Sequence, residues 1–286
     1  MPDADEIRAA QRQMWGKFSA GWEKWDDIVL NTNREVGEAI IDALQIAEDQ
    51  QHLDVAAGTG EPGLTIAKRA PGGRVTVTDI APEMLEAARR RAKAQGLTNV
   101  GFQECGAEDL PFPDKSFDSV SCRFGLMFIA DVSTAVAEIT RVLKPGGRVG
   151  ASVWAGPEVN AWATIPGGAI ATEVDMPAPD PDAPGMYRWA RAGAISDRFR
   201  AAGLQDVKEW DVPILLVADS AEQYWQLVQE LTAPVVAALS QVDEAARARI
   251  TAKVIEGAKQ YESDGKVRLP GTARVIVGTK ERPASA

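Results

Sequence analysis

The sequence predicts an α/β fold in which helices cover both faces of a doubly wound, mostly parallel sheet of seven strands. Between residues 51 and 154, short β-branched runs alternate with helical stretches, an alternation typical of parallel strands joined by crossover helices. A glycine-rich turn follows the first run, at residues 56–63. Two further β-branched runs, at 206–217 and 272–280, bring the number of expected strands to seven.

The elements before and within this region are expected as follows. A helix precedes the first strand, and its Trp15, Phe18, Trp22 and Trp25 recur at intervals that place them on one face. Strands are expected at 51–55, 74–78, 100–103, 117–122 and 148–153. Helices are expected at 82–95, where Pro82 suits a first helical position, and at 132–143, which the breaker at 144–147 ends.

The elements after the fifth strand are less regular. Residues 177–184 are a run of Pro, Asp and Ala that predicts a loop. Helical patterns follow at 192–202, 221–231 and 243–261, around the two late strands.

Length and composition limit the possible functions. The 286 residues allow one large domain or a domain with an appended cap, and 45% hydrophobic residues are enough for a sizeable core. The chain has 31 Lys and Arg against 41 Asp and Glu, a formal net charge of −10. Because nucleic-acid binding rests on clustered cations, this balance argues against a nucleic-acid partner.

The chain also lacks the signals of several other classes. Its two cysteines, Cys105 and Cys122, cannot form a disulfide framework, and no residues have metal-ligand spacing, so no metal is expected. The only histidine, His52, precedes Asp54 in the first strand and is expected to be structural, which disfavours hydrolase chemistry. No apolar run suggests a signal peptide or a stable membrane insertion, so we expect a cytoplasmic protein. The oligomeric state is left open.

The glycine-rich turn has two interpretations. Gly58, Gly60 and Gly63 satisfy the dinucleotide-binding pattern after a strand, and Asp79 follows Gly60 by 19 residues, so an NAD(P)-dependent oxidoreductase is one interpretation. Asp54, however, precedes Gly58 by four residues. A carboxylate there opposes a pyrophosphate and suits a cofactor that carries an ammonium or sulfonium charge. A third interpretation is a catalytically silent scaffold that keeps the cofactor fold.

Four collinear motifs resemble the class I S-adenosylmethionine-dependent methyltransferases, particularly the ubiquinone and menaquinone C-methyltransferase branch. They are Leu-Asp-Val-Ala-Ala-Gly-Thr-Gly at 53–60, Val-Thr-Asp-Ile-Ala-Pro-Glu-Met-Leu at 77–85, Gly-Ala-Glu-Asp-Leu-Pro-Phe-Pro-Asp-Lys-Ser-Phe-Asp at 106–118 and Val-Leu-Lys-Pro-Gly-Gly-Arg at 142–148. The resemblance implies a Rossmann-like fold and S-adenosyl-L-methionine as cofactor.

The resemblance also assigns roles around the cofactor. The backbone at Gly58 and Gly60 would close over the methionine moiety with Asp54 near its ammonium, and Asp79 would accept from both ribose hydroxyls. From its place at the end of the fourth strand, Arg123 is expected either to bind a carboxylate of cofactor or substrate or to belong to a structural ion pair. Two positions depart from the family, which often has glycine at Ala56 and Asp or Asn at Gly106. The full cofactor-binding set is Asp54, Ala56, Gly58, Gly60, Asp79, Ile80, Met84, Ala107, Glu108 and Arg123.

The resemblance further implies an organisation in four segments: an N-terminal helical lid (1–45), the cofactor-binding core (46–156), a helical cap or substrate-loop insert (157–191) and a C-terminal completion of the sheet (192–286). The insert is rich in aromatic residues, which favours a small aromatic or apolar acceptor that is methylated by in-line displacement. No catalytic base is predicted. The substrate-binding candidates are Phe18, Trp22, Phe124, Met127, Trp154 and Tyr187.

Overall fold

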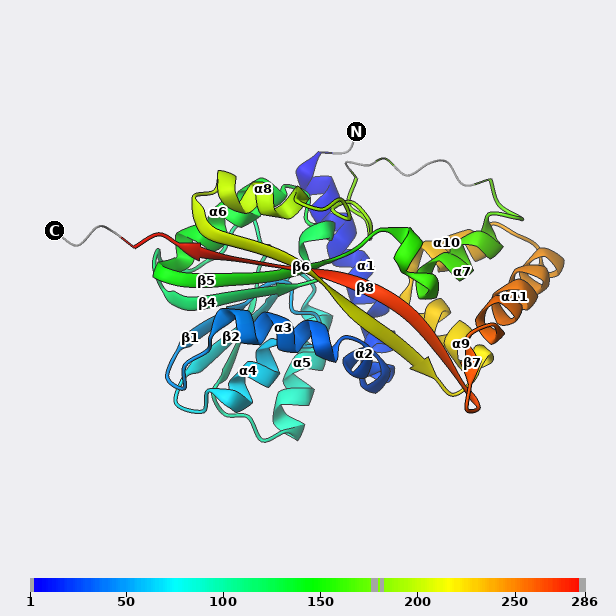
Figure 1. Ribbon diagram of the computed structural model, residues 1–286, viewed down its shortest axis with the longest axis horizontal. Coiled ribbons are helices and arrows are strands. Elements are labelled where there is room, and N and C mark those ends of the chain that lie inside the picture. Colours follow the sequence, from blue (N-terminus) through cyan, green and yellow to red (C-terminus); the bar gives the residue numbers. More distant parts are fainter. Residues whose placement is uncertain (1–2, 176–179, 181–182, 283–286) are drawn as a thin grey trace.

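A computed structural model describes residues 3–175, 180 and 183–282, and it contains all seven expected strands in one sheet (Figure 1). The strand order is β3-β2-β1-β4-β5-β8-β6, and a two-residue strand, β7, which the sequence did not predict, pairs with β8. The first five strands are parallel, and β8 is antiparallel to both of its long neighbours. The strands are β1 (Gln51–Asp54), β2 (Arg74–Asp79), β3 (Val100–Glu104), β4 (Phe117–Arg123), β5 (Leu143–Trp154), β6 (Leu204–Ala218), β7 (Glu262–Ser263) and β8 (Lys266–Lys280).

Helices cover both faces of this sheet. Gly150 of β5 faces Ile40 and Leu44 of α3 (Arg34–Leu44). Gly278 of β8 pairs with Val149, the residue before Gly150, and faces Phe199 of α8 (Ala194–Ala201). Since successive strand residues point to opposite faces, α3 and α8 lie on opposite sides. Figure 1 shows α4 (Gly63–Arg69) and α5 (Pro82–Ala94) on the side of α3, and α6 (Val132–Val142) beside α8. The doubly wound arrangement is confirmed.

The strand order reverses between β1 and β4. From β1 the chain continues to β2 and β3 on one side, and β4 and β5 lie on the other. Ligands of open α/β sheets bind beyond the carboxyl ends of the strands at such a switch point. The turn after β1 and the loop after β4 therefore flank the expected site.

The cap helices have a hydrophobic core of their own. The antiparallel pair of β6 and β8 extends past the parallel strands, and beside its far end lie α7 (Ala161–Ile170), α9 (Ala221–Leu231), α10 (Ala233–Leu239) and α11 (Glu244–Lys259), as Figure 1 shows. Tyr224, Trp225, Ile250 and Leu269 are buried together there. The predicted insert contributes α7, and it packs with C-terminal helices that the sequence analysis placed with the sheet. Most of the loop expected at 177–184 lies outside the described residues.

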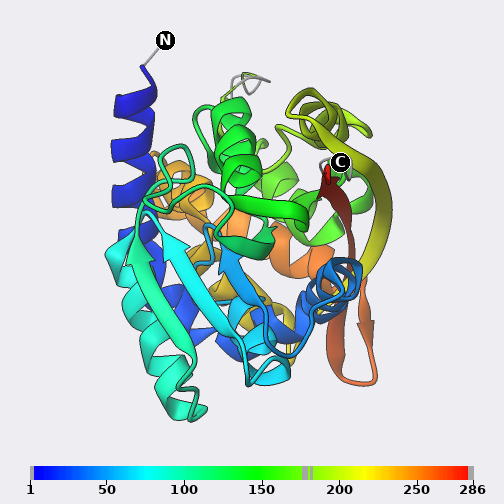
Figure 2. The same ribbon diagram turned by 90° about the vertical axis from the view of Figure 1, so that its left-hand side faces the viewer.

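The N-terminal helix joins the two cores. Helix α1 (Ala4–Lys24) begins with a capping box between Asp3 and Glu6, and it packs against α5 of the core and α9 of the cap. Figure 2 shows its upper part beyond the arrowheads of the parallel strands. Helix α2 (Asp26–Thr32) follows directly, so Trp25 lies between two helices and not in the predicted stripe on one helix. No described helix is long and apolar enough to cross a membrane.

Candidate active site

The turn after β1 has an unusual backbone. Ala56 and Gly58 are left-handed, with φ of 52° and 56°, and Gly60 has φ of 104°. A side chain at Gly58 would meet no atom within 4 Å, whereas one at Gly60 would strike Leu64, and one at Gly63 would approach an oxygen of Asp54 to 2.8 Å. Gly58 therefore leaves the backbone open to a ligand, while the other two glycines are needed for packing.

Asp79 holds this turn in place from the end of β2. Its Oδ2 accepts from the Gly58 amide at 2.9 Å and its Oδ1 accepts from the Ala81 amide at 2.9 Å. Burial raises the pKa of the Asp79 carboxyl to about 6, against the lowering effect of these bonds. Each carboxylate oxygen can accept a second hydrogen bond, so Asp79 both shapes the turn and retains acceptors for two hydroxyl groups.

Asp54 lies beneath the turn. Its carboxylate is completely buried, with Oδ2 accepting from the Gly63 amide at 2.7 Å and Oδ1 from the Ser121 hydroxyl at 2.6 Å. Burial raises the pKa of Asp54 to about 7, although both hydrogen bonds and the positive charge of Arg123 oppose the rise. Any influence of Asp54 on a ligand in the turn is therefore exerted through the protein interior, where charge effects are strong.

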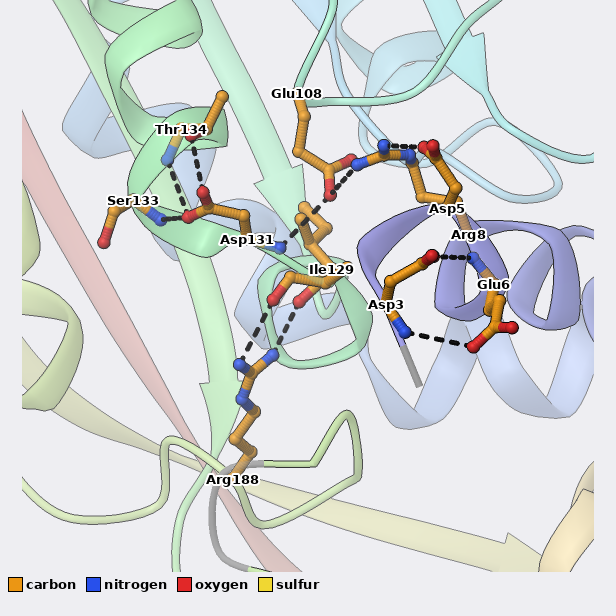
Figure 3. A network of polar contacts seen from close by, with 11 residues as sticks. Asp3, Asp5, Glu6, Arg8, Glu108, Ile129, Asp131, Ser133, Thr134 and Arg188 are labelled. Atoms are coloured by element: carbon orange, nitrogen blue, oxygen red, sulfur yellow. Dashed lines mark hydrogen bonds and ion pairs between the residues drawn. The ribbon is translucent and has the colours of Figure 1, made fainter. Parts of the chain in front are cut away.

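Glu108, one of the cofactor-binding candidates, connects several segments of the fold (Figure 3). Its Oε1 accepts from Arg8 of α1 at 3.4 Å and from the Asp131 amide at 3.2 Å. Asp131 caps α6, and Arg188 donates to the carbonyl of Ile129 at 2.6 Å. This network joins the lid, the loop after β3, the loop after β4 and the cap segment.

Arg123 ends β4 on the face of Asp54 and Ser121. Its side chain makes no hydrogen bond or ion pair with the residues that the structure describes. Burial lowers the pKa of its guanidinium, while the charges of Glu61 and Asp54 raise it. A partly buried guanidinium without a direct partner is suited to binding a carboxylate.

Aromatic residues line the ends of β4 and β5. Phe124, with φ of 59°, stacks on Trp154 with ring centroids 4.1 Å apart and planes 13° apart. Trp162 of α7 lies 4.9 Å from Trp154. Phe124 and Trp154 were expected to bind substrate, whereas Trp162 was expected only as one of the aromatic residues of the insert. The cap brings Trp162 to the stack.

A second aromatic group comes from the lid. Trp15 of α1 contacts both Trp22, at 6.0 Å, and Phe128 of the loop after β4, at 5.1 Å. Trp22 Nε1 and Tyr187 Oη are among the buried side-chain polar atoms that have no hydrogen-bond partner in the described part of the chain. Burial, with the nearby charge of Glu158, raises the pKa of Tyr187 to about 12, so its hydroxyl keeps its proton at neutral pH. Unsatisfied buried donors of this kind require an explanation.

The other candidates have different surroundings. Met127 is fully buried in the core, and Phe18 lines a shallow groove between α1 and the cap helices. The remaining cofactor candidates lie around the turn and the loop after β3, with Met84 and Ala107 buried and Ile80 half-buried.

A buried ionic network, which the sequence analysis missed, fastens the lid to the turn. Arg91 of α5 pairs with Asp26 of α2 at 2.7 Å and with Glu61 of the turn at 3.1 Å. Its Nη1 also donates to the Thr59 carbonyl at 2.6 Å. Burial raises the pKa of Asp26 even though Arg91 lowers it. Asp26, Glu61 and Arg91 are far apart in the sequence and are brought together only by the packing of α2 and α5 against the turn, so no sequence signal indicated the network.

The similarity to known proteins identifies the family. A methyltransferase domain model matches residues 53–150. A demethylmenaquinone methyltransferase of Thermus thermophilus is 50% identical over 97 residues, which are 34% of this chain and 44% of that protein. An uncharacterised protein of Mycobacterium tuberculosis is 33% identical over 242 residues, 80% of this chain and 82% of that protein. The chain belongs to the class I S-adenosylmethionine-dependent methyltransferases.

The fold of this methyltransferase agrees with that assignment. The YcgJ protein of Bacillus subtilis superposes with a TM-score of 0.56 at 23% identity, over 87% of this chain and 100% of that chain. The expected family, fold and cofactor, S-adenosylmethionine, are confirmed, and the dinucleotide interpretation of the glycine turn is set aside. The chain spans less than half the length of the Thermus protein.

Proposed function

We propose that the methyltransferase transfers a methyl group from S-adenosylmethionine to a small aromatic acceptor that binds between the lid and the strand ends. The observation that carries this proposal is the stack of Phe124 on Trp154, at the carboxyl ends of β4 and β5, next to the cofactor turn. A flat acceptor ring matches these walls, because offset or edge contacts between aromatic rings are favourable.

The residues around the turn are suited to the cofactor. The open approach at Gly58 leaves room for the methionine moiety, and the free lone pairs of Asp79 match the two ribose hydroxyls. Asp54 would stabilise the ammonium through the interior, and Arg123 would bind the carboxylate. When bound, the cofactor supplies a methyl group on a positively charged sulfur. The protein then has to align the acceptor and exclude water, and alignment alone is worth up to roughly 7–11 kcal/mol.

The unpaired donors indicate which acceptors fit. Trp22 Nε1 and Tyr187 Oη would both donate to oxygen atoms of the acceptor, as found on a phenol or quinol. The Thermus relative is named for demethylmenaquinone, whose ring carries such oxygens, and this supports the proposal. Because Tyr187 stays protonated at neutral pH, it acts as a donor and not as a general base.

Calorimetry followed by an acceptor screen tests the proposal. S-adenosylhomocysteine should bind and NADH should not. With labelled S-adenosylmethionine, quinols and phenols should be methylated in preference to amines and thiols. Binding of NADH alone would contradict the cofactor assignment, and exclusive methylation of aliphatic amines would contradict the aromatic acceptor.

Variants of the stack refine this test. Phe124→Ala should raise the KM for the acceptor about tenfold, because an aromatic wall is lost, and should leave the affinity for S-adenosylhomocysteine within about twofold. Trp210→Ala removes an exposed tryptophan of β6 and serves as the matched control, for which we expect unchanged kinetics. Equal effects of both substitutions would contradict the role of the stack.

A further inference from the structure

A chain of buried polar groups runs along β1 and β4 toward Asp54. His52 Nδ1 lies 2.8 Å from Ser119 Oγ, and His52 Nε2 lies 2.8 Å from Ser121 Oγ. Ser121 in turn donates to Asp54 Oδ1, and at the other end Ser119 Oγ lies 3.4 Å from Oε1 of the half-buried Gln50. In the strand register His52 pairs with Ser119 and Asp54 with Ser121, so all four side chains point to one face.

This row of side chains, from Ser119 through His52 and Ser121 to Asp54, is fully hydrogen-bonded when Asp54 is ionised. Ser121 then donates to Asp54, His52 donates to Ser121 from Nε2, and Ser119 donates to His52 Nδ1. Every proton in the chain points toward the carboxylate. His52 is the Nε2–H tautomer in this arrangement.

The same side chains are also fully hydrogen-bonded in the opposite polarity, in which every donor points away from Asp54. A proton on Asp54 Oδ1 donates to Ser121, Ser121 donates to His52 Nε2, His52 donates to Ser119 from Nδ1, and Ser119 donates to Gln50. One polarity becomes the other when each proton moves along its own hydrogen bond and one proton is exchanged between solvent and Ser119 Oγ, beside the half-buried Gln50, whose Oε1 only accepts. The balance is a single proton, and no buried polar group loses its partner.

We propose that Ser119, His52 and Ser121 are positioning residues that set the charge of Asp54, and that cofactor binding locks them in the polarity with His52 protonated on Nε2. This inference rests on the proposed location of the cofactor ammonium near Asp54. A positive charge there favours ionised Asp54, which requires every donor in the chain to point toward it.

The surroundings of Asp54 are consistent with a switch between these states. The charged or titratable groups that act on it are Arg123 at the end of β4, Glu61 of the turn and the Cys122 thiol, while α4 contributes the Gly63 amide and α3 presents apolar Ile40 and Leu44 to this face. Burial raises the pKa of Asp54 to about 7 and lowers the pKa of His52 to about 3. His52 therefore stays neutral, and it responds by changing its tautomer.

Nitrogen-15 NMR of the imidazole tests the chain directly, because His52 is the only histidine. In the cofactor-free protein, we expect Nδ1–H near pH 5.5 and Nε2–H near pH 8. Saturation with S-adenosylhomocysteine at pH 6 should produce the Nε2–H form. A single tautomer across this range would overturn the proposal, whether or not the ligand binds.

Ligand binding gives a second, independent readout. The affinity for S-adenosylhomocysteine should fall as the pH falls below 7, toward a limit of about tenfold per pH unit. Methylthioadenosine keeps the ribose and lacks the amino-acid group. The pH dependence of its affinity should therefore reflect the titration of Asp79 and not that of Asp54. Parallel pH profiles for the two ligands would overturn the inference. If S-adenosylhomocysteine does not bind at all, the proposed function is overturned, and the NMR measurement on the cofactor-free protein still tests the inference.

Matched variants separate positioning from simple packing. Ser121→Ala removes the donor to ionised Asp54, so the midpoint of the S-adenosylhomocysteine profile should rise by about one pH unit and the tautomer should no longer follow the pH. Ser121→Thr restores a hydroxyl and should restore both readouts. Ser119→Ala leaves the hydrogen bond between Ser121 and Asp54 in place. It should therefore change the tautomer of His52 more than it changes the midpoint of the S-adenosylhomocysteine pH profile. Equal profiles for Ser121→Ala and the wild type would overturn the role of Ser121.

Discussion

Ala56 and Gly125 are packed tightly against each other between the cofactor turn and the loop after β4. A Cβ added at Gly125 would lie 2.7 Å from the Ala56 Cβ and 2.7 Å from Cys122 Sγ. Ala56 itself is left-handed, a conformation that costs a non-glycine residue roughly 1 kcal/mol. The turn therefore tolerates alanine at position 56 only because position 125 is glycine.

This packing predicts the outcome of a double-mutant cycle. Gly125→Ala should lower the free energy of unfolding by about 1–3 kcal/mol through overpacking, and adding Ala56→Gly should recover part of the loss. Urea unfolding measures both. Gly167→Ala is the control, since a Cβ there meets no atom within 4 Å and the position is helical, so stability should hold or rise slightly. Additive effects of the two substitutions would contradict the proposed contact.

Asp79 has two roles that an alanine substitution would remove together. Asp79→Ala should weaken binding of S-adenosylhomocysteine more than tenfold, because the turn loses the Gly58 contact and the ribose loses its acceptors. Calorimetry with the 2′-deoxy analogue separates these roles. The wild type should prefer the ribose form, and the variant should not discriminate. A variant that keeps the wild-type preference would contradict the ribose role.

At the scale of elements, helix α5 holds the lid through two adjacent arginines in different surroundings. Arg91 is 10% exposed and pairs with Asp26 of α2, whereas Arg90 is 58% exposed and pairs with Glu23 of α1. Removing one member of a buried pair leaves an uncompensated charge, while an exposed pair contributes little. The lid is therefore fastened mainly at α2.

The two arginines provide a matched comparison. Arg91→Met should cost about 3–5 kcal/mol and increase hydrogen exchange in α2, because Asp26 and Glu61 remain buried without their cation. Arg90→Met should cost less than about 1 kcal/mol. Denaturant unfolding and amide exchange measure both effects, and a similar loss in the two variants would show that burial does not decide the strength of the fastening.

At the scale of the whole molecule, three buried groups make stability depend on pH. The pKa of Asp54 is raised to about 7 and that of Asp79 to about 6, so the folded protein keeps protons that the unfolded chain releases, and this stabilisation is lost as the pH rises through those values. His52, whose pKa is lowered to about 3, acts in the opposite direction below about pH 6.5.

The balance of these effects can be measured without cofactor. From pH 6 to 8 the free energy of unfolding should fall by about 1 kcal/mol, since two carboxyls outweigh one imidazole. Asp54→Asn removes the largest contribution, so the fall should disappear. Denaturant unfolding across this range tests the prediction, and parallel curves for both proteins would contradict the assigned titration of Asp54.

The sequence by itself determined the sheet and the cofactor turn. Buried parallel strands require continuous apolar runs and their crossover helices require a periodic apolar face, so both are visible locally, as are the left-handed positions that call for glycine at 58 and 60. Helical periodicity shows that a face is apolar, but it does not show what covers it. Only the tertiary structure decided that α7 packs with α9, α10 and α11, that Trp162 reaches Trp154, and that Ser121 and His52 lie against Asp54. Those contacts depend on strand order and register, which join residues far apart in the chain.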